Sequence, residues 1–372
     1  MSAAHVEPRA VTHTGEVVRA GFLAVVAIAG YAVVLARSYI LPDTFFGDGD
    51  LIRSVALGTS TADDFYTNTA RVYAFFGLQH SPDIAALLGY TLALVAVLLV
   101  FLRLHGRPAG WAMTFVTAMT IMLSAVYLGD FSKDALVVPI TIAVLALPAQ
   151  ARWTSLIIVI ILVYGIQFRA YWLAIAGLFA AYFLLLRRTR SLWILVSAAL
   201  ALGAILSIAI FLALGVPATS FRASANEYRN VVETGSIIEP FVSFSEPLSS
   251  VVNTCLTLLS LIVPWTLFVR LSPYYTAVAG AMLTLWLTFF VGLRRTGAAD
   301  VRALWCAALP IALLTVQALF EPDYGSALRH LTPLLPLFLY LSWAGTARRR
   351  IVISESYAPK ATLKRDRGWE LA

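Results

Sequence analysis

Long runs of apolar residues, separated by short polar stretches, recur along almost the whole chain. A bilayer core about 30 Å thick needs roughly 20 apolar residues per crossing helix. We therefore expect an all-α, polytopic helix bundle with one transmembrane domain over residues 1–347 and outer loops at 42–83 and 217–273. The pattern predicts ten membrane-spanning helices, at 20–41, 84–102, 110–129, 135–149, 154–168, 170–186, 192–215, 274–293, 303–320 and 331–347.

An eleventh apolar stretch, 251–269, is long enough to cross, but the positive-inside rule argues against it. If it crossed, Arg294, Arg295, Arg302 and the Lys and Arg residues after residue 347 would all lie outside. We expect instead a re-entrant or interfacial segment on the outer face, interrupted by Pro264 and Trp265. The N- and C-termini are then cytoplasmic, and the first span is an uncleaved signal anchor in the cytoplasmic (inner) membrane.

Composition supports the membrane assignment. Of 372 residues, 60% are hydrophobic and only 13% charged, with mean hydropathy +0.83, which is too apolar for a water-soluble domain. With ten spans, most of the 27 Lys and Arg residues fall on the cytoplasmic side and most of the 20 acidic residues outside. The net charge of +7 is therefore an orientation signal and does not indicate nucleic-acid binding. The polar tail 348–372 lacks helical periodicity and is expected to be a disordered cytoplasmic end.

The sequence does not favour a structural metal or disulfides. Cys255 and Cys306 lie in apolar stretches without a second cysteine or a histidine at metal-binding spacing. Both are interpreted as small, lipid-compatible residues.

The first outer loop carries two candidate carboxylates, Asp48 and Asp50, in the stretch "GDGDLIRSVA". The apolar residues that follow recur at helical spacing, which predicts a short helix on the membrane surface, opened by residues 47–50. Carboxylates at a helix N-terminus are also favoured simply as caps. The sequence leaves capping and chemistry both open.

A second set of charges lies beside the short spans 135–149 and 154–168. A 15-residue helix is only about 22 Å long, so its outer end should stop below the membrane surface. Lys133, Asp134 and Arg169 would then be recessed and face the bundle, since charge facing lipid is costly. The alternative is that Lys133 and Asp134 form a local ion pair.

Further cations lie near the outer face later in the chain. Arg222 and Arg229, seven residues apart, share a helical face and suit a diphosphate, although a solvated surface helix would show the same spacing. Arg329 and His330 stand at the start of the tenth span, where they can reach inward. A single interfacial histidine is more often a satisfied polar group than a catalyst.

Four short features together resemble a family. They are "SKDAL" at the start of a span, an arginine after the next span, an outer Pro-Trp pair, and "DYGSALRHLTPLLPL" before the last helix. This pattern is similar to bacterial O-antigen-polymerase-like and GT-C-type glycosyltransferases, over most of the chain as topology but only in these motifs as sequence. GT-C enzymes carry adjacent acidic residues after the first helix, whereas Gly49 separates Asp48 from Asp50 here. We therefore favour a polymerase or transferase over a strict GT-C enzyme.

The resemblance implies a polyprenyl-(di)phosphate-linked sugar or oligosaccharide as donor at the outer face, with membrane lipid and proteins of envelope glycan assembly as partners. The acceptor hydroxyl would be deprotonated by one of three catalytic candidates, Asp48, Asp50 or His330. No cofactor is required, and no ligand cluster favours a divalent metal, which the sequence leaves open. The expected substrate-binding residues are Lys133, Asp134, Arg169, Arg222, Arg229 and Arg329.

Two other functions fit the same sequence. A transporter or flippase for a lipid-linked glycan would also need recessed charges, but it should show broken helices near the midplane or repeat symmetry. A non-catalytic assembly subunit would need no chemistry at all.

Overall fold

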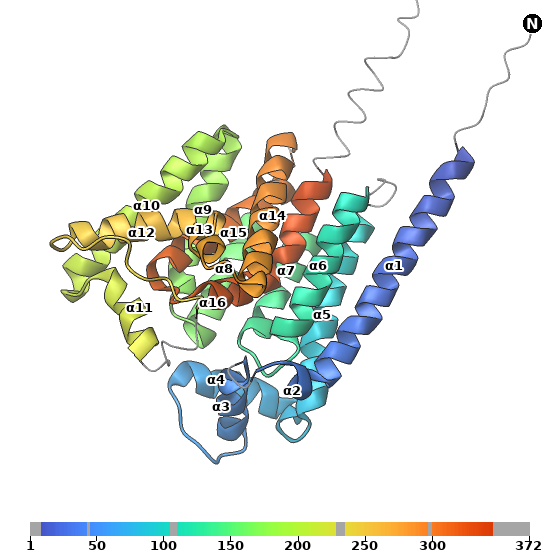
Figure 1. The fold of residues 1–372 in the computed structure, drawn as a ribbon, viewed down its shortest axis with the longest axis horizontal. Helices are drawn as coiled ribbons and strands as arrows, with labels where there is room; N and C mark the ends of the chain where they lie inside the picture. The colour runs from blue at the N-terminus through green and yellow to red at the C-terminus, as the bar shows by residue number, and fades with distance from the viewer. Residues whose placement is uncertain (1–8, 43–44, 105–109, 228–234, 297–299, 345–372) are drawn as a thin grey trace, which may run out of the picture.

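A computed structural model describes residues 9–42, 45–104, 110–227, 235–296 and 300–344 (Figure 1). Within these ranges the regular structure is helical, apart from an isolated bridge between Ile237 and Asp323. The expected all-α fold is therefore confirmed. Among the described residues, seven helices are long and apolar enough to cross a membrane: α1 (Arg9–Leu35), α5 (Pro82–Arg103), α6 (Trp111–Leu128), α8 (Thr154–Phe168) with the turn before it, α10 (Leu192–Leu214), α14 (Pro273–Arg295) and α15 (Val301–Phe320).

Shorter helices complete the architecture. Helical residues also occupy the three remaining predicted spans, at α7 (Val138–Ala146), at α9 (Trp172–Arg188) and at residues 335–344. The expected short length of α7 and α8 is confirmed. The other helices are α2 (Arg37–Ile40), α3 (Gly47–Ala56), α4 (Asp64–Phe75), α7 (Val138–Ala146), α9 (Trp172–Arg188), α11 (Ala218–Glu227), α12 (Leu248–Ile262), α13 (Trp265–Val269) and α16 (Tyr324–Leu331).

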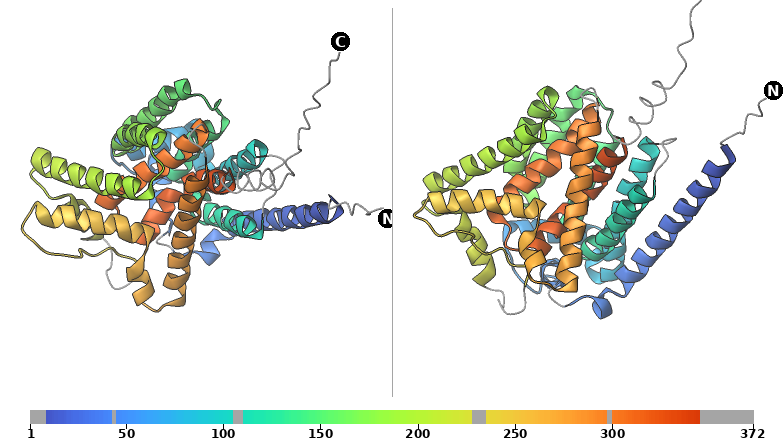
Figure 2. Two further views of the ribbon diagram at one scale, coloured as in Figure 1. Left: turned by 90° about the horizontal axis from the view of Figure 1, so that it is seen from above. Right: turned by 45° about the horizontal axis from the view of Figure 1, so that its top comes forward.

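The apolar segment 251–269 is broken where the sequence predicted. Helix α12 ends at Ile262, and α13 begins directly after Pro264, whose missing N–H and fixed φ prevent a continuous helix. Helix α12 runs at a steep angle to α14 in both views of the bundle (Figures 1 and 2). This segment therefore differs in direction from its long neighbour.

Helix α15 forms the centre of the bundle. Every residue from Arg302 to Leu319 is buried, as expected for a helix that is apolar all round. Its few polar groups find partners on neighbouring helices: the Trp305 indole donates to the Thr154 hydroxyl at 2.9 Å, and Thr315 lies 2.8 Å from the Tyr182 hydroxyl. Buried polar atoms are usually hydrogen-bonded, and these two contacts meet that requirement for Trp305 and Thr315.

Two arginines cap the end of helix α7, where Ala146 is exposed. Arg103 donates to the carbonyls of Leu145 and Ala146, and Arg302 donates to the Leu147 carbonyl at 2.6 Å. The last carbonyls of a helix have no partner within it, so guanidinium groups stabilise this end. These two arginines therefore have a structural role.

Helices α2, α3 and α4 lie at the end of the molecule opposite the start of α1 (Figure 1). The Asp63 carboxylate caps α4 by accepting from the Tyr66 backbone N–H at 2.9 Å. Helices α3 and α4 pack around an apolar cluster that is separate from the main core, which we call the α3–α4 cluster. It consists of Ile52, Ala70, Tyr73, Leu78, Ala85 and Phe131.

Candidate active site

The Asp134 carboxylate, at the start of the 3₁₀ turn that leads into α7, is the centre of a charged network. Its side chain is only 1% exposed. Arg169, which follows α8, lies 3.1 Å from Oδ1, and the Arg329 Nε on α16 donates to Oδ2 at 3.1 Å. A buried carboxylate is stable only when it is paired in this way. Three segments distant in the sequence therefore meet at Asp134.

Arg329 connects this centre to the segment between α1 and α5. Its Nη2 lies 3.0 Å from Asp48 Oδ2, and the Tyr66 hydroxyl donates to Asp48 Oδ1 at 2.6 Å. Burial alone would raise the pKa of Asp48, but Arg329 and the Tyr66 hydrogen bond together lower it below its usual value. Asp48 is in the first turn of α3 without capping it, so its partners lie outside its own helix.

The Lys133 ammonium has a different environment. It lies 3.2 Å from the centroid of the Tyr66 ring, a cation–π contact, and the residue is 9% exposed. No described carboxylate lies within ion-pair distance, so the local pair with Asp134 does not form. Burial lowers the pKa of Lys133 to about 8, an effect to which Arg169 adds. Lys133 is thus a recessed cation without a carboxylate partner.

His330 joins the network from α16. Its Nδ1 lies 3.0 Å from the Glu321 carboxylate and its Nε2 3.9 Å from Asp134 Oδ1. Burial would raise the pKa of Glu321, but His330 lowers it, so Glu321 is ionised and Nδ1 carries the donated proton. Both ring nitrogens therefore face carboxylates.

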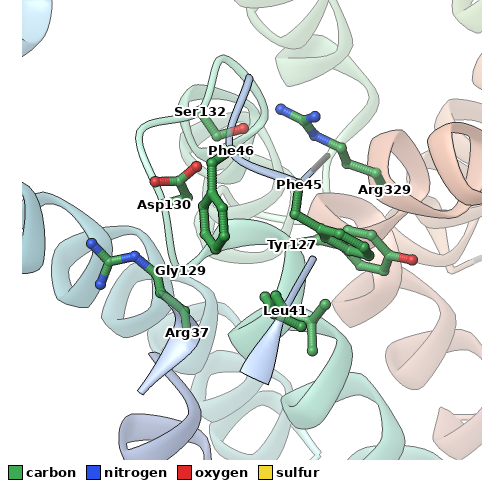
Figure 3. A pocket seen from close by; sticks show the side chains of 10 residues that line it. Arg37, Leu41, Phe45, Phe46, Tyr127, Gly129, Asp130, Ser132 and Arg329 are labelled. Atoms are coloured by element: carbon green, nitrogen blue, oxygen red, sulfur yellow. The ribbon is translucent and has the colours of Figure 1, made fainter. Parts of the chain in front are cut away.

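A small pocket opens beside the network. Its free volume is about 20 Å³, enough for one or two water molecules. Arg329 is part of its wall, and in Figure 3 the Phe46 ring lies between Arg329 and Asp130 in projection. The pocket is lined by Arg37, Leu41, Phe45, Phe46, Val126, Tyr127, Gly129, Asp130, Ser132 and Arg329.

Gly49 allows α3 to approach this pocket closely. A Cβ atom at Gly49 would lie 2.4 Å from Asp130 Oδ2, well inside contact distance. The glycine that separates Asp48 from Asp50 in the sequence therefore lets α3 lie directly against the Asp130 carboxylate.

A larger hollow lies beside α13, with a volume of about 410 Å³, within the range of ligand sites. It is joined to α16 through the Thr266 hydroxyl, which donates to the Tyr324 hydroxyl at 2.6 Å. Glu239 and Arg270, both exposed, supply its charged groups. Its lining residues are Ile237, Ile238, Glu239, Pro240, Phe241, Trp265, Thr266, Val269 and Arg270.

The network brings together six of the nine candidates from the sequence: Asp48, Lys133, Asp134, Arg169, Arg329 and His330. Asp50 is exposed and has no contact with them. Arg222 instead donates to the Thr257 hydroxyl at 2.6 Å, away from the network. Arg229 lies outside the described residues, so its expected pairing with Arg222 is not described.

Sequence reasoning missed two tyrosines of the site. Tyr66 links Asp48 to Lys133, and the Tyr171 hydroxyl accepts from Arg169 at 2.6 Å. The Asp63 cap signal predicts that a helix begins near Tyr66, but nothing in the sequence pairs this residue with Asp48.

Comparison of the chain with protein-family models, with curated proteins and with solved structures finds no match. Among the described residues, no group of three or more His, Cys, Asp or Glu side chains could hold a metal ion. The function of the protein is therefore inferred from the geometry of the charged network.

Proposed function

We propose that this protein is a membrane glycosyltransferase or polysaccharide polymerase that uses a polyprenyl-(di)phosphate-linked donor at the outer face of the cytoplasmic membrane. The observation that carries the proposal is the position of Arg329, which contacts Asp48 and Asp134 and also lines a pocket. Its Nη1 has no partner among the contacts of the described residues. A guanidinium with free donors at a pocket wall suits a phosphate oxygen.

The charges of the network favour an exchange of partners on binding. Lys133, Arg169 and Arg329 are balanced by Asp48, Asp134 and Glu321, so a phosphate must displace a carboxylate. Asp48 is the exchangeable one, because its side chain is 33% exposed whereas that of Asp134 is 1% exposed. The donor phosphate would replace Asp48 at Arg329, with Lys133 supplying a second cation.

In this proposal the cations stabilise the leaving group. When the bond from the anomeric carbon to the phosphate oxygen breaks, negative charge grows on that oxygen. Fixed cations in a water-poor site lower the energy of such a transition state. Asp134, buried between Arg169 and Arg329, keeps both guanidinium groups in place.

We also propose an arrangement of the helices in the membrane and a binding site for the glycan. We place ten crossings in the bilayer, with both termini in the cytoplasm and α3, α4 and α16 on the outer side. The hollow beside α13 would hold sugar rings against Trp265 and Phe241, whose ring centroids are 5.7 Å apart. Aromatic faces are well suited to the apolar faces of sugars.

The test is a set of single substitutions in the host cell, read out by mass spectrometry of lipid-linked glycans. Lys133→Met and Arg329→Met should each cause lipid-linked intermediates to accumulate at unchanged protein level. A polymerase would accumulate single repeat units, and a single-sugar transferase a glycan one residue short. Asp64→Asn, at an exposed carboxylate on α4 with no contact to the network among the described residues, is the control. Unchanged glycans in both Met variants would instead favour an assembly subunit.

A flippase is distinguished from a transferase by the membrane leaflet on which the intermediate accumulates. If Lys133→Met leaves an elongated glycan on the cytoplasmic leaflet, inaccessible to an enzyme added outside spheroplasts, the protein moves its substrate. Accumulation on the outer leaflet supports the transferase.

A further inference from the structure

Asp130 is the one carboxylate at the pocket that no cation pairs. Among the described residues it has no ion pair within contact distance, whereas Asp48 and Asp134 each contact arginine and Glu321 contacts His330. Arg37, the nearest cation on α2, lies 3.0 Å from Asp83 instead. Asp130 accepts a hydrogen bond from the Phe131 backbone N–H, and without an ion pair its remaining lone pairs stay available to a ligand in the pocket.

The surroundings of Asp130 are charged but at longer range. Arg37 and Arg329 face it from α2 and α16, Asp50 faces it from α3, and α3 packs against it at Gly49. Burial raises the pKa of the Asp130 carboxyl to about 6, and Asp50 adds to this rise. A carboxylate with a pKa near the working pH is a better proton acceptor than one held low by an arginine.

We propose that Asp130 is the general base that removes the proton from the acceptor hydroxyl. This inference rests on the proposed transferase function. The acceptor oxygen attacks the anomeric carbon of the donor, and the bond from that carbon to the phosphate oxygen breaks. The phosphate leaves with the bonding electron pair, and the hydroxyl proton passes to Asp130. Arg329 lines the same pocket as Asp130 and also contacts Asp48 in the network, so the cation proposed for the leaving group and the proposed base belong to one site.

The three bases expected from the sequence are less suited to this step. Asp48 is held by Arg329 and Tyr66, and Asp50 is exposed and outside the pocket. The His330 Nε2 faces Asp134 at 3.9 Å, so the free lone pair of a neutral ring would point at a carboxylate. Asp130 alone combines a free carboxylate with a place in the pocket wall.

The experiment compares wild type, Asp130→Asn and Asp130→Glu, purified in detergent, with donor and acceptor lipids extracted from host membranes. Transfer by the wild type should rise with pH to a plateau, with the midpoint near pH 6. Asp130→Asn should lose at least about 100-fold in rate, the usual contribution of a general base, and should lose this pH limb. Asp130→Glu should regain part of the rate with a shifted limb, which a merely structural residue would not do.

Donor binding separates this inference from the proposed function. Stabilisation of the protein by added pyrophosphate, followed as a thermal shift, should persist in Asp130→Asn and disappear in Lys133→Met. If Asp130→Asn transfers at the wild-type rate with the same pH limb, Asp130 is not the base and the transferase stands. If the wild type neither transfers glycan nor responds to pyrophosphate, the transferase itself is wrong.

Discussion

The Arg329 guanidinium donates to Asp134 Oδ2 at 3.1 Å although 195 residues separate them in the chain. Arg169 holds the other oxygen of the same carboxylate at 3.1 Å. One buried carboxylate therefore ties together the loop before α7, the end of α8 and the end of α16.

This arrangement predicts an asymmetry between two substitutions. Asp134→Asn leaves two guanidinium groups without their anion and should lower the free energy of unfolding by about 3–5 kcal/mol. Arg329→Met should cost less than that, because Arg169 still neutralises Asp134. Chemical unfolding in detergent measures both. Equal losses would mean that Arg169 does not compensate for Arg329.

Lys133 predicts how anion binding depends on pH. Because its pKa is lowered to about 8, the ammonium loses its charge as pH rises through and above that value. Pyrophosphate affinity should therefore fall above pH 8, with a midpoint at or above pH 8, since a bound anion favours the protonated form. Lys133→Arg stays charged to pH 10 and should not show this fall. Isothermal titration at several pH values measures it, and the same decline in both proteins would exclude Lys133 as its source.

Gly49 predicts a packing defect with a built-in control. Gly49→Ala places a Cβ 2.4 Å from Asp130 Oδ2, so α3 or the Asp130 side chain must move, and both stability and transfer should fall. At Gly47, on the same helix, an added Cβ meets nothing within 4 Å. Gly47→Ala should be neutral or stabilise by up to about 1 kcal/mol through helix propensity. Thermal unfolding of the pair decides the matter, and similar effects of both changes would contradict the packing argument.

Replacing Arg222 should change the free energy of unfolding in the opposite direction from replacing Arg169, although both arginines are buried. Arg222 is 4% exposed with Nη2 unpaired and no described carboxylate partner, whereas Arg169 is 7% exposed and paired with Asp134. Arg222→Met removes an uncompensated charge and should raise the free energy of unfolding by about 1 kcal/mol. Arg169→Met leaves Asp134 with one partner fewer and should lower it by several kcal/mol. A destabilised Arg222→Met variant would show that the Thr257 hydrogen bond outweighs the burial cost.

The sequence predicted the helices well because their apolar runs and proline breaks are local signals. The break at Pro264, the short helix after residue 47 and the shortness of α7 and α8 all follow from such signals. The short length of α7 and α8 also indicated that charged residues beside them are recessed, which identified Lys133, Asp134 and Arg169 as candidates. Their partners could not be predicted in this way, because Tyr66 and Arg329 reach the site through tertiary packing. Asp130 stands out only in the structure, where it lacks the ion pairs that Asp134 makes with described residues.

The separate α3–α4 cluster has a consequence for the order in which parts of the molecule unfold. Tyr73 and Phe131 belong to that small cluster, while Asp134, three residues after Phe131, begins the turn that enters the main core. The ion pair of Arg329 with Asp48 therefore connects the part of the molecule around the main core to the part around the smaller cluster. High salt or low pH weakens such an ion pair but leaves the apolar packing of both clusters unchanged. Melting should then occur in two stages, in which α3 and α4 exchange their amide hydrogens well before the buried bundle does.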